Sequence, residues 1–212
     1  MSTEITPPRR SALEFFDRQF RQQVEAGDYA LNPFESAVLP SLHGDVLDLG
    51  CGLGNLALAA AAQGCRVTAL DASGTAVADL ARRAGERDLA LAVHCADLRH
   101  YVPARQYDCV VSIGLLMFMG CPDARGLLVR VRDAVRPDGL MAVNVLIEGT
   151  TYLEMFEPGG YCLFGRDELS GVFAGWEIQL SRHEDFPAPG GTLKRFHTLV
   201  ARRPLMPPSG TR

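Results

Sequence analysis

A short segment, Val46–Asn55, constrains the fold of this chain more than any other. In it a run of apolar residues ends in three closely spaced glycines, Gly50, Gly52 and Gly54, and an alanine- and leucine-rich stretch follows. Glycine adopts backbone angles that other residues avoid, and it lets the backbone approach a ligand closely. A buried strand, a tight turn and a helix in this order predict the first unit of a wound parallel sheet.

The rest of the chain repeats this alternation of short apolar runs and helical segments. Strands are expected at Asp45–Leu49, Arg66–Leu70, Leu89–His94, Tyr107–Ile113, Leu140–Ile147, Trp176–Ser181 and Leu193–Ala201. Helices are expected at Ala12–Ala26, Pro33–Pro40, Asn55–Gln63, Gly74–Gly85, Ala124–Val135 and Arg166–Phe173. Only the loop Pro187–Gly191 joins the last two strands, so they should pair antiparallel. We therefore expect an α/β fold, a Rossmann-like seven-stranded and mostly parallel sheet with helices on both faces and an antiparallel last strand.

Length and composition favour one ordinary globular domain. The 212 residues suffice for one well-buried core, and we expect a single domain over 1–203, with a helical cap at 11–40 and a disordered tail at 204–212. The net charge of −4 and the absence of basic runs argue against a nucleic-acid partner. No apolar run is long enough for a membrane span, and no secretory signal opens the chain. The six cysteines form no C-x-x-C pair, so we expect them to be reduced and mostly buried, as in a cytoplasmic protein.

The acid that precedes the glycines indicates the kind of ligand. A dinucleotide-binding loop has the spacing G-x-G-x-x-G, whereas this one reads G-x-G-x-G and has Asn55 where the third glycine of the dinucleotide pattern would fall. Asp48 lies two residues before Gly50. A pyrophosphate gains nothing from a nearby carboxylate, but a ligand that carries an ammonium and a sulfonium group does. The segment therefore favours S-adenosylmethionine over a nicotinamide dinucleotide.

Two further acids follow the next two strands. Asp71 ends the second strand, where an acid can accept hydrogen bonds from ribose hydroxyls. Asp97 follows the third strand, where it can accept from an adenine amino group while the Leu98 backbone pairs with the ring. Each acid alone would be an ordinary loop residue, but in series with Asp48 they predict an adenosine site.

These segments resemble those of the class I S-adenosylmethionine-dependent methyltransferases, over most of the chain. Within that class the resemblance is closest to the tellurite-resistance methyltransferases. It rests on Tyr29–Leu31, on Ser112–Phe118 and on Leu193–Phe196. The resemblance implies S-adenosylmethionine as cofactor and methyl transfer to a small molecule. The cofactor site that it implies comprises Tyr29, Asp48, Gly50, Cys51, Gly52, Gly54, Asn55, Asp71, Ala72, Asp97, Leu98, Ile113 and Gly114.

The acceptor should enter at the carboxyl ends of the fourth and fifth strands. The tellurite-resistance family carries a His-Arg pair between its last two strands, which the loop from Arg182 to Gly191 lacks. A soft sulfur, selenium or tellurium nucleophile needs little help from a base, and such a small molecule is the expected acceptor. Candidate catalytic residues on this side are His183, Lys194, Arg195 and Tyr152.

Each acceptor-side feature also has an ordinary structural explanation. Leu116–Phe118 can be core as readily as acceptor wall, and His183 can be a surface histidine. Lys194 and Arg195 alternate along a strand, so only one of them can face the pocket. Cys162 can be an inert buried thiol, and no spacing of His, Cys and Asp indicates a metal site. An NAD-dependent oxidoreductase and a non-catalytic cofactor-binding protein remain alternative readings.

Overall fold

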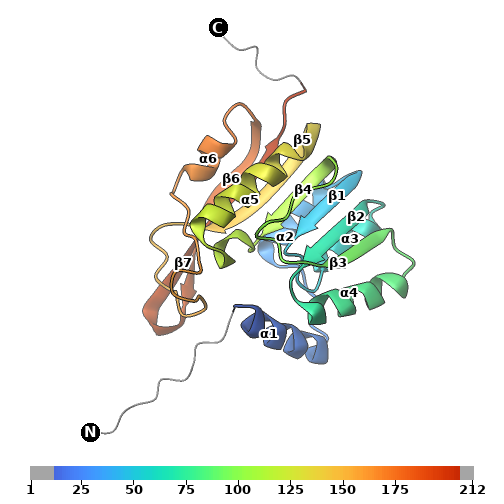
Figure 1. Ribbon diagram of the computed structural model, residues 1–212, viewed down its shortest axis with the longest axis horizontal. Helices are drawn as coiled ribbons and strands as arrows, with labels where there is room; N and C mark the ends of the chain where they lie inside the picture. Colours follow the sequence, from blue (N-terminus) through green and yellow to red (C-terminus); the bar gives the residue numbers. More distant parts are fainter. Residues whose placement is uncertain (1–11, 206–212) are drawn as a thin grey trace.

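In the computed structural model, which describes residues 12–205, one sheet organises the chain (Figure 1). Its strands are β1 (Asp45–Leu49), β2 (Arg66–Asp71), β3 (Leu91–Cys95), β4 (Tyr107–Ile113), β5 (Val135–Leu146), β6 (Glu177–Ala188) and β7 (Thr192–Arg202). Their spatial order is β3-β2-β1-β4-β5-β7-β6. The pairs from β3 to β5 are parallel, and β7 runs antiparallel to both of its neighbours. The predicted fold class is therefore confirmed.

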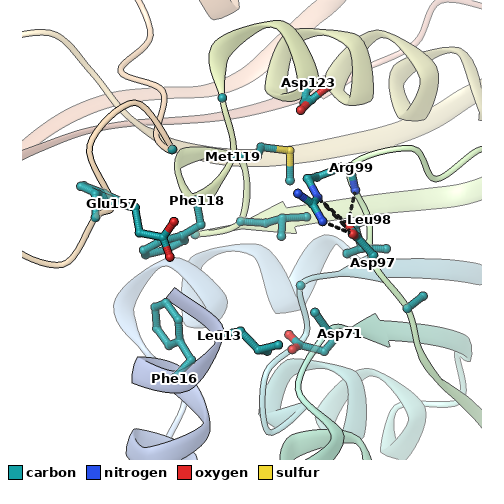
Figure 2. A pocket seen from close by; sticks show the side chains of 18 of the residues that line it. Leu13, Phe16, Asp71, Asp97, Leu98, Arg99, Phe118, Met119, Asp123 and Glu157 are labelled. Atoms are coloured by element: carbon teal, nitrogen blue, oxygen red, sulfur yellow. Dashed lines mark hydrogen bonds and ion pairs between the residues drawn. The ribbon is translucent and has the colours of Figure 1, made fainter. Parts of the chain in front are cut away.

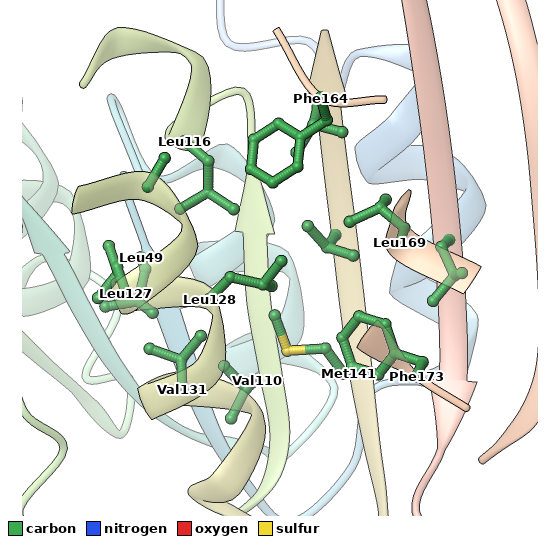
Figure 3. Close-up of a cluster of buried hydrophobic side chains, with 14 of the residues drawn as sticks. Leu49, Val110, Leu116, Leu127, Leu128, Val131, Met141, Phe164, Leu169 and Phe173 are labelled. Carbon is green, nitrogen blue, oxygen red and sulfur yellow. The ribbon is translucent and has the colours of Figure 1, made fainter. Parts of the chain in front are cut away.

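Helices cover both faces of this sheet. They are α1 (Ala12–Ala26), α2 (Pro33–Val38), α3 (Asn55–Ala62), α4 (Gly74–Gly85), α5 (Cys121–Asp133) and α6 (Glu168–Val172). One core cluster joins α2, α3 and α4 to one face of the sheet. A second joins α5 and α6 to the opposite face, where Leu127, Leu128 and Val131 of α5 pack over Val110 (Figure 3). None of the helices in residues 12–205 has the length and apolar character that a membrane crossing requires.

Helix α1 lies over the edge of the sheet at which β1, β2 and β4 end. The Ser73 hydroxyl at the start of α4 donates a hydrogen bond to Asp17 of α1. The Phe16 ring packs edge-on against Phe118, with centroids 4.7 Å apart. The Phe20 ring comes so close to Gly52 that a Cβ there would lie 3.1 Å from it. The predicted cap thus covers the glycine turn, although its first residue, Ser11, and residues 206–212 of the predicted tail lie outside the described residues.

The second half of the sheet differs from prediction at two places. Strand β6 was predicted to end at Ser181 but continues to Ala188. His183 therefore belongs to a strand, and the connection to β7 is only Pro189–Gly191. Because β6 lies at the edge of the sheet, many of its polar side chains face solvent. The part of β6 after Ser181 therefore lacks the alternation of apolar and polar residues that identifies a strand in a sequence. Strand β5 begins at Val135 and not at the predicted Leu140, and its pairing with β4 is irregular between these two residues.

The prediction that all cysteines are reduced is wrong for one pair. Cys121, at the start of α5, and Cys162 form a disulfide, and their Cα atoms lie 4.6 Å apart. They are 41 residues apart in sequence, so no local spacing of cysteines predicted that they would pair. Cys51, Cys65 and Cys109 are free and buried, whereas Cys95 is free and exposed.

Candidate cofactor and acceptor site

The glycine turn after β1 is held in a conformation that needs glycine. The N–H groups of Gly50 and Cys51 both donate to the Leu70 carbonyl of the neighbouring strand. Gly50 has a φ of 71°, and a Cβ on it would lie 2.8 Å from the Leu115 Cβ. A side chain at this position would therefore meet both backbone strain and a clash. The turn ends at Asn55, where α3 begins.

Asp71 at the end of β2 fixes this turn from the side. One of its carboxylate oxygens accepts from the Gly52 N–H at 2.8 Å, and the other accepts from the Ser73 N–H at 2.8 Å. Burial raises the pKa of Asp71 above its usual value, and the backbone hydrogen bonds partly oppose that rise. The carboxylate is thus held rigidly at the carboxyl end of the strand, where its free lone pairs can accept from a ligand.

A cavity of about 620 Å³ opens at this edge of the sheet (Figure 2). Six of the residues predicted to bind the cofactor line it: Gly50, Asp71, Ala72, Asp97, Leu98 and Gly114. The structure thus brings together residues from the ends of four strands. Helix α1 forms a further wall with Leu13, Phe16 and Phe20, which the sequence reasoning missed. The amphipathic pattern of α1 indicates that one face of the helix packs against the protein, but it does not identify the residues that this face contacts.

The adenine candidate Asp97 is held by a cation. Its carboxylate forms an ion pair with Arg99, with the Arg99 Nε 3.0 Å from each oxygen (Figure 2). This pairing lowers the pKa of Asp97 to about 2. The Asp97 side chain is 56% exposed, so it remains accessible from the cavity. Leu98 beside it is buried.

Asp48 lies beneath the turn and not on the cavity wall. Burial, followed by the nearby negative charges of Glu35 and Asp71, raises the pKa of Asp48 to about 8. Burial also raises the pKa of Glu35, which comes from α2. Asp48, Glu35 and Asp71 thus gather around the glycine turn, and burial raises the pKa of all three carboxyl groups. A cation bound at this end of the cavity would favour their ionised forms.

The remaining cofactor candidates surround the turn but do not line the cavity. The guanidinium of Arg83 lies 4.0 Å from the centre of the Tyr29 ring. The Asn55 side-chain amide donates to the Ala30 carbonyl at 3.2 Å, which ties the chain before α2 to the start of α3. Cys51, Gly52, Gly54 and Ile113 likewise lie outside the cavity lining. Their predicted contacts with a cofactor stay predictions.

The four residues predicted on the acceptor side do not lie together, and two of them, His183 and Arg195, are engaged within the β6–β7 ladder. His183 bonds through Nε2 to the Arg166 carbonyl at 2.9 Å and stacks on His197, so it does not reach the cavity. Arg195 pairs with Asp185 at 3.2 Å. Neither residue is placed to act on a molecule in the cavity, because each is engaged elsewhere in the β6–β7 ladder.

Lys194 and Tyr152 lie together in a second hollow beside the cavity. The Lys194 ammonium is 4.8 Å from the centre of the Tyr152 ring. Of the adjacent cations on β7, it is therefore Lys194 that faces a pocket, and this pocket is not the main cavity.

The apolar run after β4 serves two purposes. Leu116 and Met117 are buried in the core, so for them the structural explanation is correct. Phe118 lines the cavity, and its ring lies 5.1 Å from that of Phe156. Phe156 in turn stacks on Tyr161 at 5.0 Å. Phe16, Phe118 and Phe156 line the cavity together and form its aromatic wall, and Phe16 and Phe118 lie across the cavity from Asp97 (Figure 2).

Known proteins resemble this chain in the segment that contains the glycine turn. Residues 46–139 match a family model described as a methyltransferase domain. Hemagglutinin 1 of Eikenella corrodens is 26% identical over 166 residues, covering 74% of this chain and 54% of that protein. The chain thus spans about half the length of the curated relative that it matches.

Solved structures extend the likeness to most of the chain. TehB from Haemophilus influenzae has a TM-score of 0.72 at 18% identity, covering 91% of this chain and 67% of TehB. The N-methyltransferase NodS from Bradyrhizobium japonicum, in complex with S-adenosyl-L-homocysteine, has a TM-score of 0.68 at 14% identity, covering 92% and 100%. At these identities the likeness to the solved structures concerns the fold alone. Residues 46–139 are therefore similar to a methyltransferase domain, and most of the chain has the fold of the solved N-methyltransferase NodS.

Proposed function

We propose that this protein transfers the methyl group of S-adenosylmethionine to a soft sulfur, selenium or tellurium nucleophile on a small molecule. The observation that carries the proposal is the cavity itself. It has Asp71, Asp97 and the glycine turn at one end, and at the other the aromatic wall of Phe16, Phe118 and Phe156 with Glu157 beside it. The first end suits a cation with a ribose and an adenine, and the second suits an apolar, water-excluding reaction site.

The side chains that line the cavity have the hydrogen-bonding groups and charges that this cofactor requires. Asp71 would accept from the ribose hydroxyls, and Asp97 with the Leu98 backbone would take the adenine. The acids below the glycine turn would face the positive charges of the methionine end. When bound, the cofactor supplies a methyl group on a positively charged sulfur, which departs as a neutral thioether.

The acceptor side favours a nucleophile that needs no strong base. Among the described residues no histidine lines the cavity, and His183 is held on β6 by the Arg166 carbonyl. An ordinary thiol has a pKa of about 8.5, so a useful fraction ionises near neutral pH without assistance. The protein's task is then to align the acceptor and to exclude water, which Phe118 and its neighbouring rings can do.

Cofactor binding should depend on pH through Asp48. Its pKa of about 8 in the unliganded protein exceeds the ordinary value of 3.8, so this group stabilises the fold when protonated, and the contribution is lost as the pH rises through about 8. A bound ammonium reverses this preference. We expect the affinity for S-adenosylhomocysteine to rise about tenfold from pH 6 to pH 8. Calorimetric titration should show the rise in the wild type and a flat profile in Asp48→Asn, and an equal rise in both would contradict the role.

The activity can be tested by incubating the protein with S-adenosylmethionine and a panel of thiols, selenite and tellurite. Formation of S-adenosylhomocysteine above a control without acceptor, with the methylated product identified by mass spectrometry, is expected for at least one soft acceptor. Turnover of amines or alcohols alone would show that the acceptor class is wrong. Tight binding of S-adenosylhomocysteine without any turnover would indicate a non-catalytic cofactor-binding protein.

A further inference from the structure

The second hollow has a volume of about 610 Å³ and shares the Phe16 side chain with the cofactor cavity. It lies between α1, the segment that follows β5, and the start of β7. Its lining consists of Phe15, Phe16, Arg18, Gln19, Gln22, Tyr152, Met155 and Lys194. Its size is in the range of small-molecule sites.

Helix α1 presents different faces to the two spaces. Leu13, Phe16 and Phe20 line the cofactor cavity. Residues 15, 18, 19 and 22, spaced as neighbours on one helix face, line the second hollow. Phe16 belongs to both linings, so it is the partition between them. A molecule in the second hollow would therefore extend toward the methyl-transfer site past this ring.

The backbone fixes Lys194 toward the hollow. The Thr151 and Tyr152 N–H groups both donate to the Leu193 carbonyl, at 2.9 and 3.1 Å. The Leu193 N–H donates to the Thr151 hydroxyl at 2.9 Å. These bonds join the segment after β5 to the start of β7 on the residue next to Lys194. The lysine and the Tyr152 ring are thus positioned together before any ligand arrives.

The charges of the two spaces are opposite in sign. The cofactor cavity contains four carboxylates and one arginine among its lining residues: Asp71, Asp97, Asp123, Glu157 and Arg99. The described lining of the second hollow contains two cations, Arg18 and Lys194, and no carboxylate. Lys194 forms no ion pair with any described residue, whereas its neighbour Arg195 is paired with Asp185. An anion bound in this hollow would meet two cations, and one of them, Lys194, has no carboxylate partner among the described residues.

We propose that the second hollow binds the anionic end of the methyl acceptor, and that this acceptor is an organic carboxylate with an apolar body. The inference rests on the proposed function and deepens it. Lys194 and Arg18 would bind the carboxylate, and the glutamine amides could donate to it. Phe15, Tyr152 and Met155 offer apolar surface that an inorganic oxyanion would leave uncovered.

The test compares two aromatic thiols that differ in charge, 4-mercaptobenzoate and its methyl ester. In the wild type we expect the carboxylate to have the higher kcat/KM. Lys194→Ala should lower that value about tenfold and change the value for the ester less than about twofold. Lys194→Arg should restore most of the loss, because it restores the charge. The matched control is Arg182→Ala, which removes an exposed cation from β6, and it should alter neither value.

A binding measurement keeps this test separate from the test of activity. Ligand-observed NMR with 4-(methylthio)benzoate and protein saturated with S-adenosylhomocysteine should show binding to the wild type and much weaker binding to Lys194→Ala. Equal binding to both proteins would overturn the inference, even if no thiol is methylated. Equal losses for acid and ester in the activity assay would overturn it too. Methylation of the ester alone would leave the proposed function standing and reject the anion site.

Discussion

Replacing Asp71 with alanine is expected to weaken the binding of S-adenosylhomocysteine by roughly 30- to 150-fold. Two charge-assisted hydrogen bonds to the ribose hydroxyls would be lost, at a cost on the order of 2–3 kcal/mol. The Gly52 and Ser73 N–H groups would lose their acceptor as well, so the glycine turn itself would loosen. Asp71→Asn, which keeps one oxygen acceptor, should fall between the wild type and the alanine variant.

Calorimetric titration provides the affinities, and thermal melting shows whether each variant is folded. The matched control is Asp133→Ala, since Asp133 is 62% exposed and pairs only with its neighbour Arg132 among the described residues. It should leave cofactor affinity unchanged. If Asp71→Ala melts like the wild type and binds the ligand equally well, the ribose lies elsewhere and the orientation of the cofactor proposed above is wrong.

The Cys121–Cys162 disulfide should make a large contribution to stability. It closes a loop between residues 41 apart, and in the chain-entropy model a loop of this size stabilises the fold by about 4 kcal/mol. The bond also joins two walls of the cofactor cavity, because Gly120 and Gly160 lie beside the two cysteines. We expect the double variant Cys121→Ser, Cys162→Ser to lose up to this amount.

Urea unfolding of the wild type with and without dithiothreitol, and of the double variant, measures this contribution. Reductant should shift the wild-type midpoint to that of the double variant and should leave the variant itself unaffected. Cys95→Ser, which removes an exposed free thiol, serves as the control and should respond to reductant like the wild type. A wild-type midpoint that is insensitive to reductant and equal to that of the double variant would contradict the assignment.

The parts of the fold that the sequence predicted are those that local chemistry determines. Strand β1 is buried along its whole length, so its apolar run predicted a strand. The glycines that follow adopt positive φ angles that other residues avoid, so they predicted the turn. The Ser73 side chain accepts from the Ala76 N–H, as expected of a helix N-cap, and α4 spans the predicted residues. The order of acids after successive strands then placed Asp71 and Asp97 on one edge.

The parts that were not predicted depend on contacts between distant residues. Nothing near Phe16 in the sequence shows that it packs on Phe118, and nothing near Cys121 shows that Cys162 is its partner. The position of His183 was misjudged because polar edge strands and loops have similar compositions. Which of Lys194 and Arg195 faces a pocket depended on the β6–β7 register, which places Asp185 opposite Arg195.

The central claim is that the cavity at the carboxyl edge of the sheet holds S-adenosylmethionine, and parallel calorimetric titrations with S-adenosylhomocysteine and NADH test it most directly. We expect saturable one-to-one binding of S-adenosylhomocysteine that Asp71→Ala weakens strongly, and no measurable heat with NADH. Saturable binding of NADH, with no binding of S-adenosylhomocysteine at millimolar concentration, would contradict it.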